Sequence, residues 1–340
     1  MSFNENKPVD DWLAQEVPET VLEPDLPIID PHHHLWDIRS FKTEPFASFQ
    51  QKVYLCEEII NDIVDGGHNV VQTVFAQCAA FYRVDGPEAM KCVGETEFVH
   101  GIGAMSRSGQ YGPVRLCSGI FGSADLRLGS AVEEVIKAHL AASANFRGIR
   151  SAFPLDLNTT FMQGYAILGK YNLSFDHYSP DVERLSGLAR LATAQPDVPV
   201  IVNHLGGKID PDADAQAFSK WQKCIDEIAA CPNAVMKCGG GQQRVGRWEP
   251  PFHMNQRKRP IGSEALCDLL YPFYRHAIEA FGPERCMFES NFPVDKESVS
   301  YRTLWNTFKR IAKRMGLSET DKNSLFSGTA ARVYRLELVG

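Results

Sequence analysis

The sequence predicts an α/β fold, a single (β/α)8 TIM barrel. Two observations lead to this prediction. Eight short runs rich in β-branched and aromatic residues alternate along the chain with stretches of helical spacing, and polar residues suited to catalysis stand at the carboxyl ends of several runs. An open doubly wound sheet has the same alternation but places its site at one switch point. The chain contains neither the G-x-G-x-x-G nor the G-x-x-x-x-G-K-[ST] motif, which weakens a nucleotide-binding interpretation.

The expected strands are short segments spread along the whole chain. They begin with the run at Ile28 and continue at residues 68–76, 120–126, 146–150, 173–177, 198–204, 234–238 and 286–291. Helical spacing predicts helices over residues 52–64, 131–144 and 182–194, with Gly66-Gly67 as the stop signal of the first. Pro87 is expected in the first turn of a further helix.

The barrel domain is expected over residues 26–340. Residues 1–25 are acidic, contain prolines and show no sustained period, so we expect them to form an N-terminal extension that lies over the domain. Two long loops are expected at the carboxyl ends of the strands: residues 79–98 after the second strand and residues 239–261 after the seventh. Loops of this size on a functional face often form a lid or a pocket wall.

Composition excludes several classes of protein. The chain has 340 residues, 44% of them hydrophobic, and a net charge of −7, which disfavours nucleic acid and an acidic membrane surface as partners. It has no run of 18 apolar residues and does not begin like a signal peptide, so a cytoplasmic location is expected. Nine cysteines without a C-x-x-C pair predict reduced thiols rather than disulfides. The sequence leaves open whether the chain forms a homo-oligomer.

A strand that ends in three consecutive histidines is the centre of the predicted site. In Asp30-Pro31-His32-His33-His34, strand alternation directs His32 and His34 to one side and His33 to the other. His177 and His204 stand at the ends of the fifth and sixth strands. A histidine-rich turn or hydrogen-bonded core histidines are the structural alternatives.

Converging neutral imidazoles can hold a divalent ion and leave one position for a water, whose pKa then falls to about 7. We therefore predict that His32, His34 and His177 bind a divalent metal. Zn2+ is the first choice, with Mn2+ or no metal as the alternatives. His204 is either a fourth ligand or a neighbour that acts on the substrate.

These motifs resemble the amidohydrolase-related family of the amidohydrolase superfamily. The resemblance rests on Asp30-x-His32-x-His34, His177, Asn203-His204-Leu205-Gly206-Gly207 and Ser290-Asn291-Phe292-Pro293, and it covers residues 26–336. It implies a metal-dependent barrel hydrolase. Within the superfamily the chain is most similar to the lactonase branch, which includes 2-pyrone-4,6-dicarboxylate, sulfomuconolactone and sugar lactonases, and the decarboxylases come next.

The chain departs from the family pattern at the eighth strand. The pattern Gly-[ST]-Asp-[WF]-Pro becomes Glu289-Ser290-Asn291-Phe292-Pro293, and the resemblance implies that the missing aspartate binds metal or acts as the base. An amide accepts no proton at neutral pH. We therefore expect Asn291 to orient water or to ligate through its oxygen, and His204 to assist proton transfer. Three carboxylates remain as alternative bases: Asp176, Glu289 and Asp295.

Basic residues on the expected catalytic face predict a small anionic substrate. The loop over residues 239–261 carries five basic residues against one acid, Glu249. For the tripeptide Arg257-Lys258-Arg259, a solvated loop or a subunit contact is the favoured interpretation. Arginine binds carboxylates through two parallel hydrogen bonds. The predicted substrate contacts are Tyr82, Arg83, Arg150, Lys237 and Arg244.

Together these features predict a hydrolase that opens the ester bond of an anionic lactone or a related carboxylated ring. Two alternatives remain open. One is a metal-dependent decarboxylase of an aromatic or enoic acid, and the other is a barrel that binds a ligand without catalysis, for which the replacement of the expected acid by Asn291 is the argument.

Overall fold

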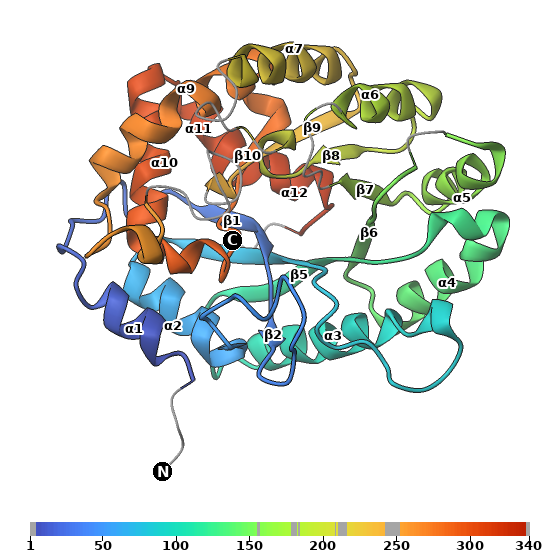
Figure 1. Ribbon diagram of the computed structural model, residues 1–340, viewed down its shortest axis with the longest axis horizontal. Helices are drawn as coiled ribbons and strands as arrows, with labels where there is room; N and C mark the ends of the chain where they lie inside the picture. The colour runs from blue at the N-terminus through green and yellow to red at the C-terminus, as the bar shows by residue number, and fades with distance from the viewer. Residues whose placement is uncertain are drawn as a thin grey trace.

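The computed structural model describes residues 5–154, 157–177, 182, 184–207, 209, 216–241 and 252–337. Eight strands form one sheet in which every neighbouring pair is parallel, and helices surround it (Figure 1). The strands follow one another around the sheet in the order β1 (Ile28–His33), β4 (Val70–Ala76), β5 (Arg115–Gly122), β6 (Phe146–Arg150), β7 (Ser174–His177), β8 (Val200–Val202), β9 (Ala234–Cys238) and β10 (Cys286–Phe288). The predicted (β/α)8 barrel is confirmed.

The barrel closes between β1 and the segment that follows β10. His33 and Phe292 form a parallel bridge, and the amide of Asn291 donates to the carbonyl of His32 at 2.9 Å. The Asp30 carboxylate spans the same seam, because it accepts the amide of Ser290 at 2.9 Å and the hydroxyl of Tyr301 at 3.0 Å. Burial raises the pKa of Asp30 to about 6. The seam therefore holds the backbone of His32 beside that of Asn291.

Helices cover the outer face of the strands. They are α2 (Cys56–Gly66), α3 (Val93–Arg107), α4 (Val132–Ala142), α5 (Thr159–Lys170), α6 (Arg184–Ala194), α7 (Ala217–Ala229), α9 (Ser263–Phe281) and α10 (Tyr301–Met315), followed by α11 (Glu319–Asn323) and α12 (Thr329–Val333). Single turns connect them: η1 (Glu88–Met90), η2 (Leu126–Ala131), η3 (His204–Gly206), η4 (Met254–Gln256), η5 (Pro283–Arg285), η6 (Asp295–Glu297) and η7 (Ser324–Gly328).

The predicted helices over residues 52–64, 131–144 and 182–194 correspond to α2, α4 and α6. The first begins later than predicted because β3 (Val53–Tyr54) pairs antiparallel with β2 (Trp36–Asp37) instead of joining the helix. Gly67 ends α2 with a φ of 72°, as the stop signal predicts. Pro87 directly precedes η1 rather than standing in the first turn of a longer helix.

Three strands show the largest differences from their predicted bounds. The third strand was predicted at 120–126 but runs over β5, which starts at Arg115, because its first half mixes polar and apolar residues and lacks a clear apolar run. The sixth and eighth strands end earlier than predicted. His204 and Asn291 have φ angles of 53° and 54°, and this left-handed conformation is incompatible with an extended strand.

Strand alternation fills the amino-terminal end of the barrel with apolar side chains. Ile29, Ile201, Val235 and Met287, each the second residue of its strand, form one buried cluster with Tyr334, which follows α12. A separate and larger cluster lies between the strands and the helices. Polar side chains nearer the carboxyl ends of the strands therefore lie next to an apolar layer.

The N-terminal segment packs on the barrel domain. The side chain of Asn6 binds the backbone of Lys52 and Val53, at 2.8 to 3.0 Å, and Glu19 accepts the amide of Ser263 at 2.6 Å. This segment also contains α1 (Lys7–Leu13), which the sequence did not predict because seven residues are too few to show a period. The boundary at residue 25 stays a prediction.

All nine cysteines are free thiols, as expected. In the part of the chain that the structure describes, we find no helix with the length and apolar character needed to cross a membrane.

Glu95 of α3 holds the loop that follows β4. Its carboxylate accepts the amides of Cys78 at 3.3 Å and Ala80 at 3.0 Å, and the side chain is buried. Burial raises the pKa of Glu95 from 4.5 to about 7, against the opposing effect of these hydrogen bonds. The folded protein therefore binds a proton at Glu95 more tightly than the unfolded chain does.

The stability of the protein should consequently depend on pH through Glu95. Its contribution is complete below pH 4.5 and is lost as the pH rises through about 7, and the raised pKa corresponds to roughly 3 kcal/mol. Glu95→Gln keeps an acceptor oxygen but removes the titration. Urea unfolding should show that wild-type stability falls between pH 5 and pH 8 by about 2 kcal/mol more than that of the variant. The same pH dependence in both proteins would contradict this role.

Candidate metal and catalytic site

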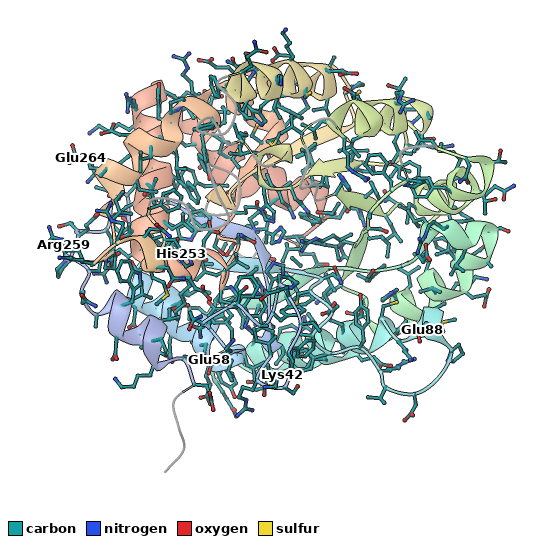
Figure 2. The ribbon with its side chains drawn as sticks, in the orientation of Figure 1. Lys42, Glu58, Glu88, His253, Arg259 and Glu264 are labelled. Carbon is teal, nitrogen blue, oxygen red and sulfur yellow. The ribbon has the colours of Figure 1, made fainter. Side chains whose placement is uncertain are left out.

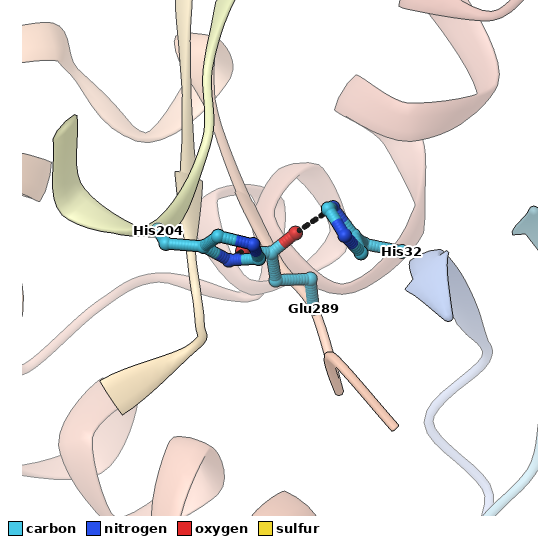
Figure 3. Close-up of side chains that lie close together, drawn as sticks. All are labelled: His32, His204 and Glu289. Atoms are coloured by element: carbon cyan, nitrogen blue, oxygen red, sulfur yellow. Dashed lines mark hydrogen bonds and ion pairs between the residues drawn. The ribbon is translucent and has the colours of Figure 1, made fainter. Parts of the chain in front are cut away.

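Three buried side chains meet at the carboxyl end of the barrel (Figure 3). Glu289 follows β10 and lies between His32 of β1 and His204 of η3. Its Oε2 is 2.9 Å from Nδ1 of His32, and its Oε1 is 2.6 Å from Nδ1 of His204. The two imidazole rings are 4.5 Å apart between centroids. We call His32, His204 and Glu289 the His–Glu–His group.

The His–Glu–His group fits a divalent ion. Its three ligand atoms, two nitrogens and one carboxylate oxygen, lie within 4.8 Å of one another. Three ligands of this kind, with a fourth position for water, are the usual donor set of a catalytic zinc. Nε2 of His32 is buried without a hydrogen-bond partner in the described chain, so a ring nitrogen of this histidine remains available.

His34 lies next to this group. Its ring centroid is 5.0 Å from that of His32, and its Nδ1 lies 2.8 Å from the carbonyl of Ala76. Because a carbonyl accepts only from an N–H, Nδ1 carries the proton and Nε2 is the basic nitrogen. The role of His34 as a metal ligand stays a prediction. His33 points elsewhere, as alternation predicts: its Nε2 lies 2.9 Å from the hydroxyl of Thr73.

His177 was predicted to converge with His32, but it does not belong to the group of ligand atoms within 4.8 Å. Its ring stacks on Phe175, two residues earlier on β7, at 6.0 Å, and its Nδ1 lies 3.1 Å from the carbonyl of Ser151. Alternation along β7 instead directs Asp176 into the barrel. Metal binding by His177 stays a prediction.

Burial sets the charges of the site. It lowers the pKa of His32 well below the usual range, and the charge of Lys237 lowers it further. Burial, and then the charge of Arg150, have the same effect on His34. Both rings are thus neutral at pH 7, which is the form that binds metals. Burial raises the pKa of Glu289 to about 8 although Lys237 and Arg150 oppose this.

Glycines after β9 let the backbone approach the His–Glu–His group. A Cβ on Gly239 would lie 2.1 Å from Cγ of Glu289, and a Cβ on Gly240 would lie 2.4 Å from Nδ1 of His204. Gly240 also has a φ of 62°. Any larger residue at these positions would displace the two side chains. The run Gly239-Gly240-Gly241 is the sequence signal that could have predicted this close approach.

Asn291 has a structural reason for replacing the family aspartate. Its Nδ2 donates to Oδ1 of Asp295 at 3.0 Å, and both side chains are buried. An aspartate at 291 would place two carboxylates together, which raises the energy of the ionised pair. Oδ1 of Asn291 has no hydrogen-bond partner in the described chain. This oxygen is the atom that would orient water, a role that stays a prediction.

Lys237 was expected on the rim, but the structure places it inside the barrel. Its Nζ lies 3.1 Å from Oδ1 of Asp176, 3.4 Å from Nδ1 of His32 and 4.1 Å from the ring centroid of Phe121. Asp176 also accepts the hydroxyl of Tyr334 at 2.8 Å. Lys237 and Asp176 thus form a fully buried ion pair against the His–Glu–His group. Tyr334 was missed because nothing local in the sequence links it to Asp176.

Three of the four remaining predicted substrate residues lie in the described part of the chain. Arg150 ends β6, donates to the carbonyl of Gln77 at 2.9 Å and lies near enough to His34 to affect its pKa. The hydroxyl of Tyr82 accepts a hydrogen bond from the side-chain amide (Nε2) of Gln77 at 2.8 Å. Arg83 pairs with Glu97 of α3 in a side-chain ion pair that is nearly half exposed. Arg244 lies outside the described residues. Their contacts with substrate stay predictions.

The described end of the loop after β9 is anchored by a buried histidine (Figure 2). Nε2 of His253 lies 3.3 Å from Oε2 of Glu297, whose Oε1 accepts the amides of Gln50 at 2.6 Å and Gln51 at 3.1 Å. Arg259, in contrast, lies at the edge of the molecule, and residues 257–259 are all exposed. This exposure agrees with a solvated basic segment rather than with a substrate contact.

Comparison with known proteins gives a family and several relatives. A family model described as amidohydrolase matches residues 116–336. An uncharacterized protein, y4mH, of Sinorhizobium fredii is 31% identical over 339 residues, which is 92% of this chain and 99% of that protein. An L-fucono-1,5-lactonase of Burkholderia multivorans is 29% identical over 48% of this chain and 50% of its own length. An L-rhamnono-gamma-lactonase of Scheffersomyces stipitis is 24% identical over 65% of this chain and 70% of its own length.

Solved structures share the fold at low identity. An amidohydrolase from Burkholderia multivorans with bound zinc has a TM-score of 0.68 and 21% identity, over 91% of this chain and 99% of that one. A probable 2-pyrone-4,6-dicarboxylic acid hydrolase from Acinetobacter baumannii with bound citric acid has a TM-score of 0.63 and 12% identity, over 91% of this chain and 99% of that one. A 5-carboxyvanillate decarboxylase from Sphingomonas paucimobilis has a TM-score of 0.56 and 12% identity, over 92% of this chain and 100% of that one.

Proposed function

Because the chain belongs to the amidohydrolase 2 family, we propose that it is a hydrolase that opens the ester bond of an anionic lactone. The observation that carries the proposal is the buried His–Glu–His group at the carboxyl end of the barrel, with the Arg150 cation beside it. The sugar lactonases among the relatives support a lactone as the substrate. The cationic side chain of Arg150 beside the group supports an anionic one.

The His–Glu–His group would hold a divalent ion. A bound ion would supply a water of lowered pKa and would polarise the carbonyl of the lactone. The zinc in a protein of the same fold is in keeping with this. Burial of all three residues excludes bulk water and strengthens the electrostatic interactions of the site.

Opening a lactone needs two proton movements. The attacking water loses a proton, and the ring oxygen gains one when its bond to the carbonyl carbon breaks. His204 would take up this proton and deliver it to the ring oxygen, and Oε1 of Glu289, 2.6 Å from Nδ1 of His204, would stabilise the protonated imidazole in the meantime. Arg150 would bind the negative charge of the substrate.

Metal analysis of the purified protein, together with a panel of neutral and carboxylated lactones, tests the proposal. We expect one divalent ion per chain and release of acid from carboxylated lactones. Release of carbon dioxide from an aromatic or enoic acid would support the decarboxylase alternative instead. A protein without metal, whose turnover survives both His32→Ala and His204→Ala, would show that the proposed site is wrong.

A further inference from the structure

A cavity of about 430 Å³, lined by both polar and apolar side chains, lies at the carboxyl ends of β5 and β6. It is adjacent to His177, because Phe153 in its wall contacts the His177 ring at 4.6 Å and the carbonyl of Ser151 is 3.1 Å from Nδ1 of His177. A volume of this size suits a small metabolite. The residues that determine its chemistry are Ser123, Asp125, Arg127, Ser151, Phe153 and Arg184.

Among the described residues that line this cavity, Arg184 is the one whose charge is not paired with a carboxylate. Asp125 and Arg127 neutralise each other, because the guanidinium of Arg127 binds the Asp125 carboxylate through two hydrogen bonds of 2.8 Å. Arg184, the first residue of α6, donates through Nη1 to the carbonyl of Phe153 at 3.1 Å. No carboxylate of the described chain forms an ion pair with Arg184. A guanidinium has five N–H donors, so most of its donors remain available to a ligand.

The other walls distinguish between kinds of ligand. Ser123 and Ser151 offer hydroxyl oxygens as acceptors, the hydroxyl of Ser151 itself donating to the carbonyl of Ala152 at 3.0 Å. The Asp125–Arg127 pair offers further polar atoms, and Phe153 offers one apolar surface. A flat aromatic acid would cover these polar groups without pairing them, which costs free energy. A hydroxylated aliphatic acid can bind its hydroxyls to the same groups and its carboxylate to Arg184.

We propose that this cavity binds the hydroxylated, carboxylate-bearing end of the substrate, with Arg184 as the residue that binds the carboxylate. The inference rests on the proposed function and names its substrate class: aliphatic hydroxylated lactones with a carboxylate away from the reacting ester. Arg184 would bind the carboxylate that lies away from the ester, whereas Arg150 would bind negative charge at the reacting end of the substrate. Arg83, which the sequence also predicts as a substrate contact, is paired with Glu97.

Two lactones that differ in one group test this assignment. D-glucaro-1,4-lactone and D-glucono-1,4-lactone share a ring, but the first ends in a carboxylate and the second in a hydroxymethyl group. Arg184→Gln should lower kcat/KM for the first roughly 10- to 100-fold, mainly through KM, and for the second less than about twofold. Arg190→Gln, at an exposed position of the same helix, is the matched control and should change neither.

Calorimetric titration with D-glucarate measures the site without turnover. The wild type and Arg190→Gln should bind it, and Arg184→Gln should bind at least about 10-fold more weakly. If Arg184→Gln does not fold, Arg184→Lys keeps the charge but loses the planar fork, and its affinity should fall below that of the wild type.

The outcomes separate the two proposals. Glucarate binding that depends on Arg184, in a protein that hydrolyses no lactone, would overturn the proposed function and leave the cavity assignment standing. Three results would overturn the assignment of Arg184. They are equal losses of kcat/KM on both lactones, no glucarate binding by the wild type, and wild-type affinity for glucarate in the position-184 variant that folds.

Discussion

Replacing Glu289 by glutamine is expected to lower kcat/KM by about 1,000-fold or more and to abolish tight binding of the divalent ion. Glutamine has almost the same shape, but its amide is a poor metal ligand and cannot take up a proton. Both imidazoles that contact Glu289, at 2.9 and 2.6 Å, would lose their carboxyl partner. Steady-state kinetics and metal analysis of the same preparation measure the two effects.

Asp62→Asn is the matched control for this variant. Asp62 of α2 is a partly buried carboxylate that is also paired with a cation, since its Oδ1 lies 2.8 Å from Nζ of Lys296, but α2 lies outside the strands. Asp62→Asn should lower stability and leave the metal content and kcat/KM within about twofold of the wild type. If Glu289→Gln instead keeps its metal and most of its activity, the His–Glu–His group is not the catalytic centre.

Replacing Lys237 by methionine should have the largest effect on stability. Lys237 and Asp176 are both fully buried, and their charges are 3.1 Å apart. Removing one partner leaves the other charge buried without compensation, which costs about 3–5 kcal/mol. Methionine fills nearly the same volume and can pack on the ring of Phe121. The free energy of unfolding, measured by urea denaturation at pH 7, should fall by that amount.

A double-mutant cycle separates the ion pair from packing. Asp176→Asn keeps the acceptor for the hydroxyl of Tyr334 but removes the charge. The double variant Lys237→Met/Asp176→Asn should recover at least about 1 kcal/mol relative to the sum of the two single losses. Strict additivity of the three values would show that the two charges do not stabilise each other.

The fold could be predicted from the sequence because its signals are local and repeated. Runs such as residues 146–150 and 234–238 became β6 and β9 with the same bounds, since a short β-branched or apolar segment between turns has few alternatives. The errors lie at strand ends. His204 and Asn291 adopt left-handed conformations that composition does not reveal, so their strands were drawn too long.

The candidate site could be predicted only in part. The sequence placed His32 and His204 at the carboxyl ends of the first and sixth strands and included Glu289 among the possible bases, and the structure brings these three together. The sequence could not show which carboxylate contacts the histidines, because the distance from each carboxylate to the histidines depends on how far its side chain reaches across the barrel. Lys237 shows the same limit: its place at a strand end was right, but its depth depends on a partner 61 residues away in the sequence, Asp176.

The site can form only when the chain is nearly complete, because the barrel closes between β1 and the segment after β10. Asp30 and Ser290, which bind each other across the seam, are separated by 260 residues. Contacts of such high sequence separation form late in folding, because a long loop must close first. His32 and Glu289 stand on opposite sides of this seam. A nascent chain that has not yet released β10 from the ribosome therefore has no assembled His–Glu–His group, and catalytic competence arises only when the two ends of the barrel meet.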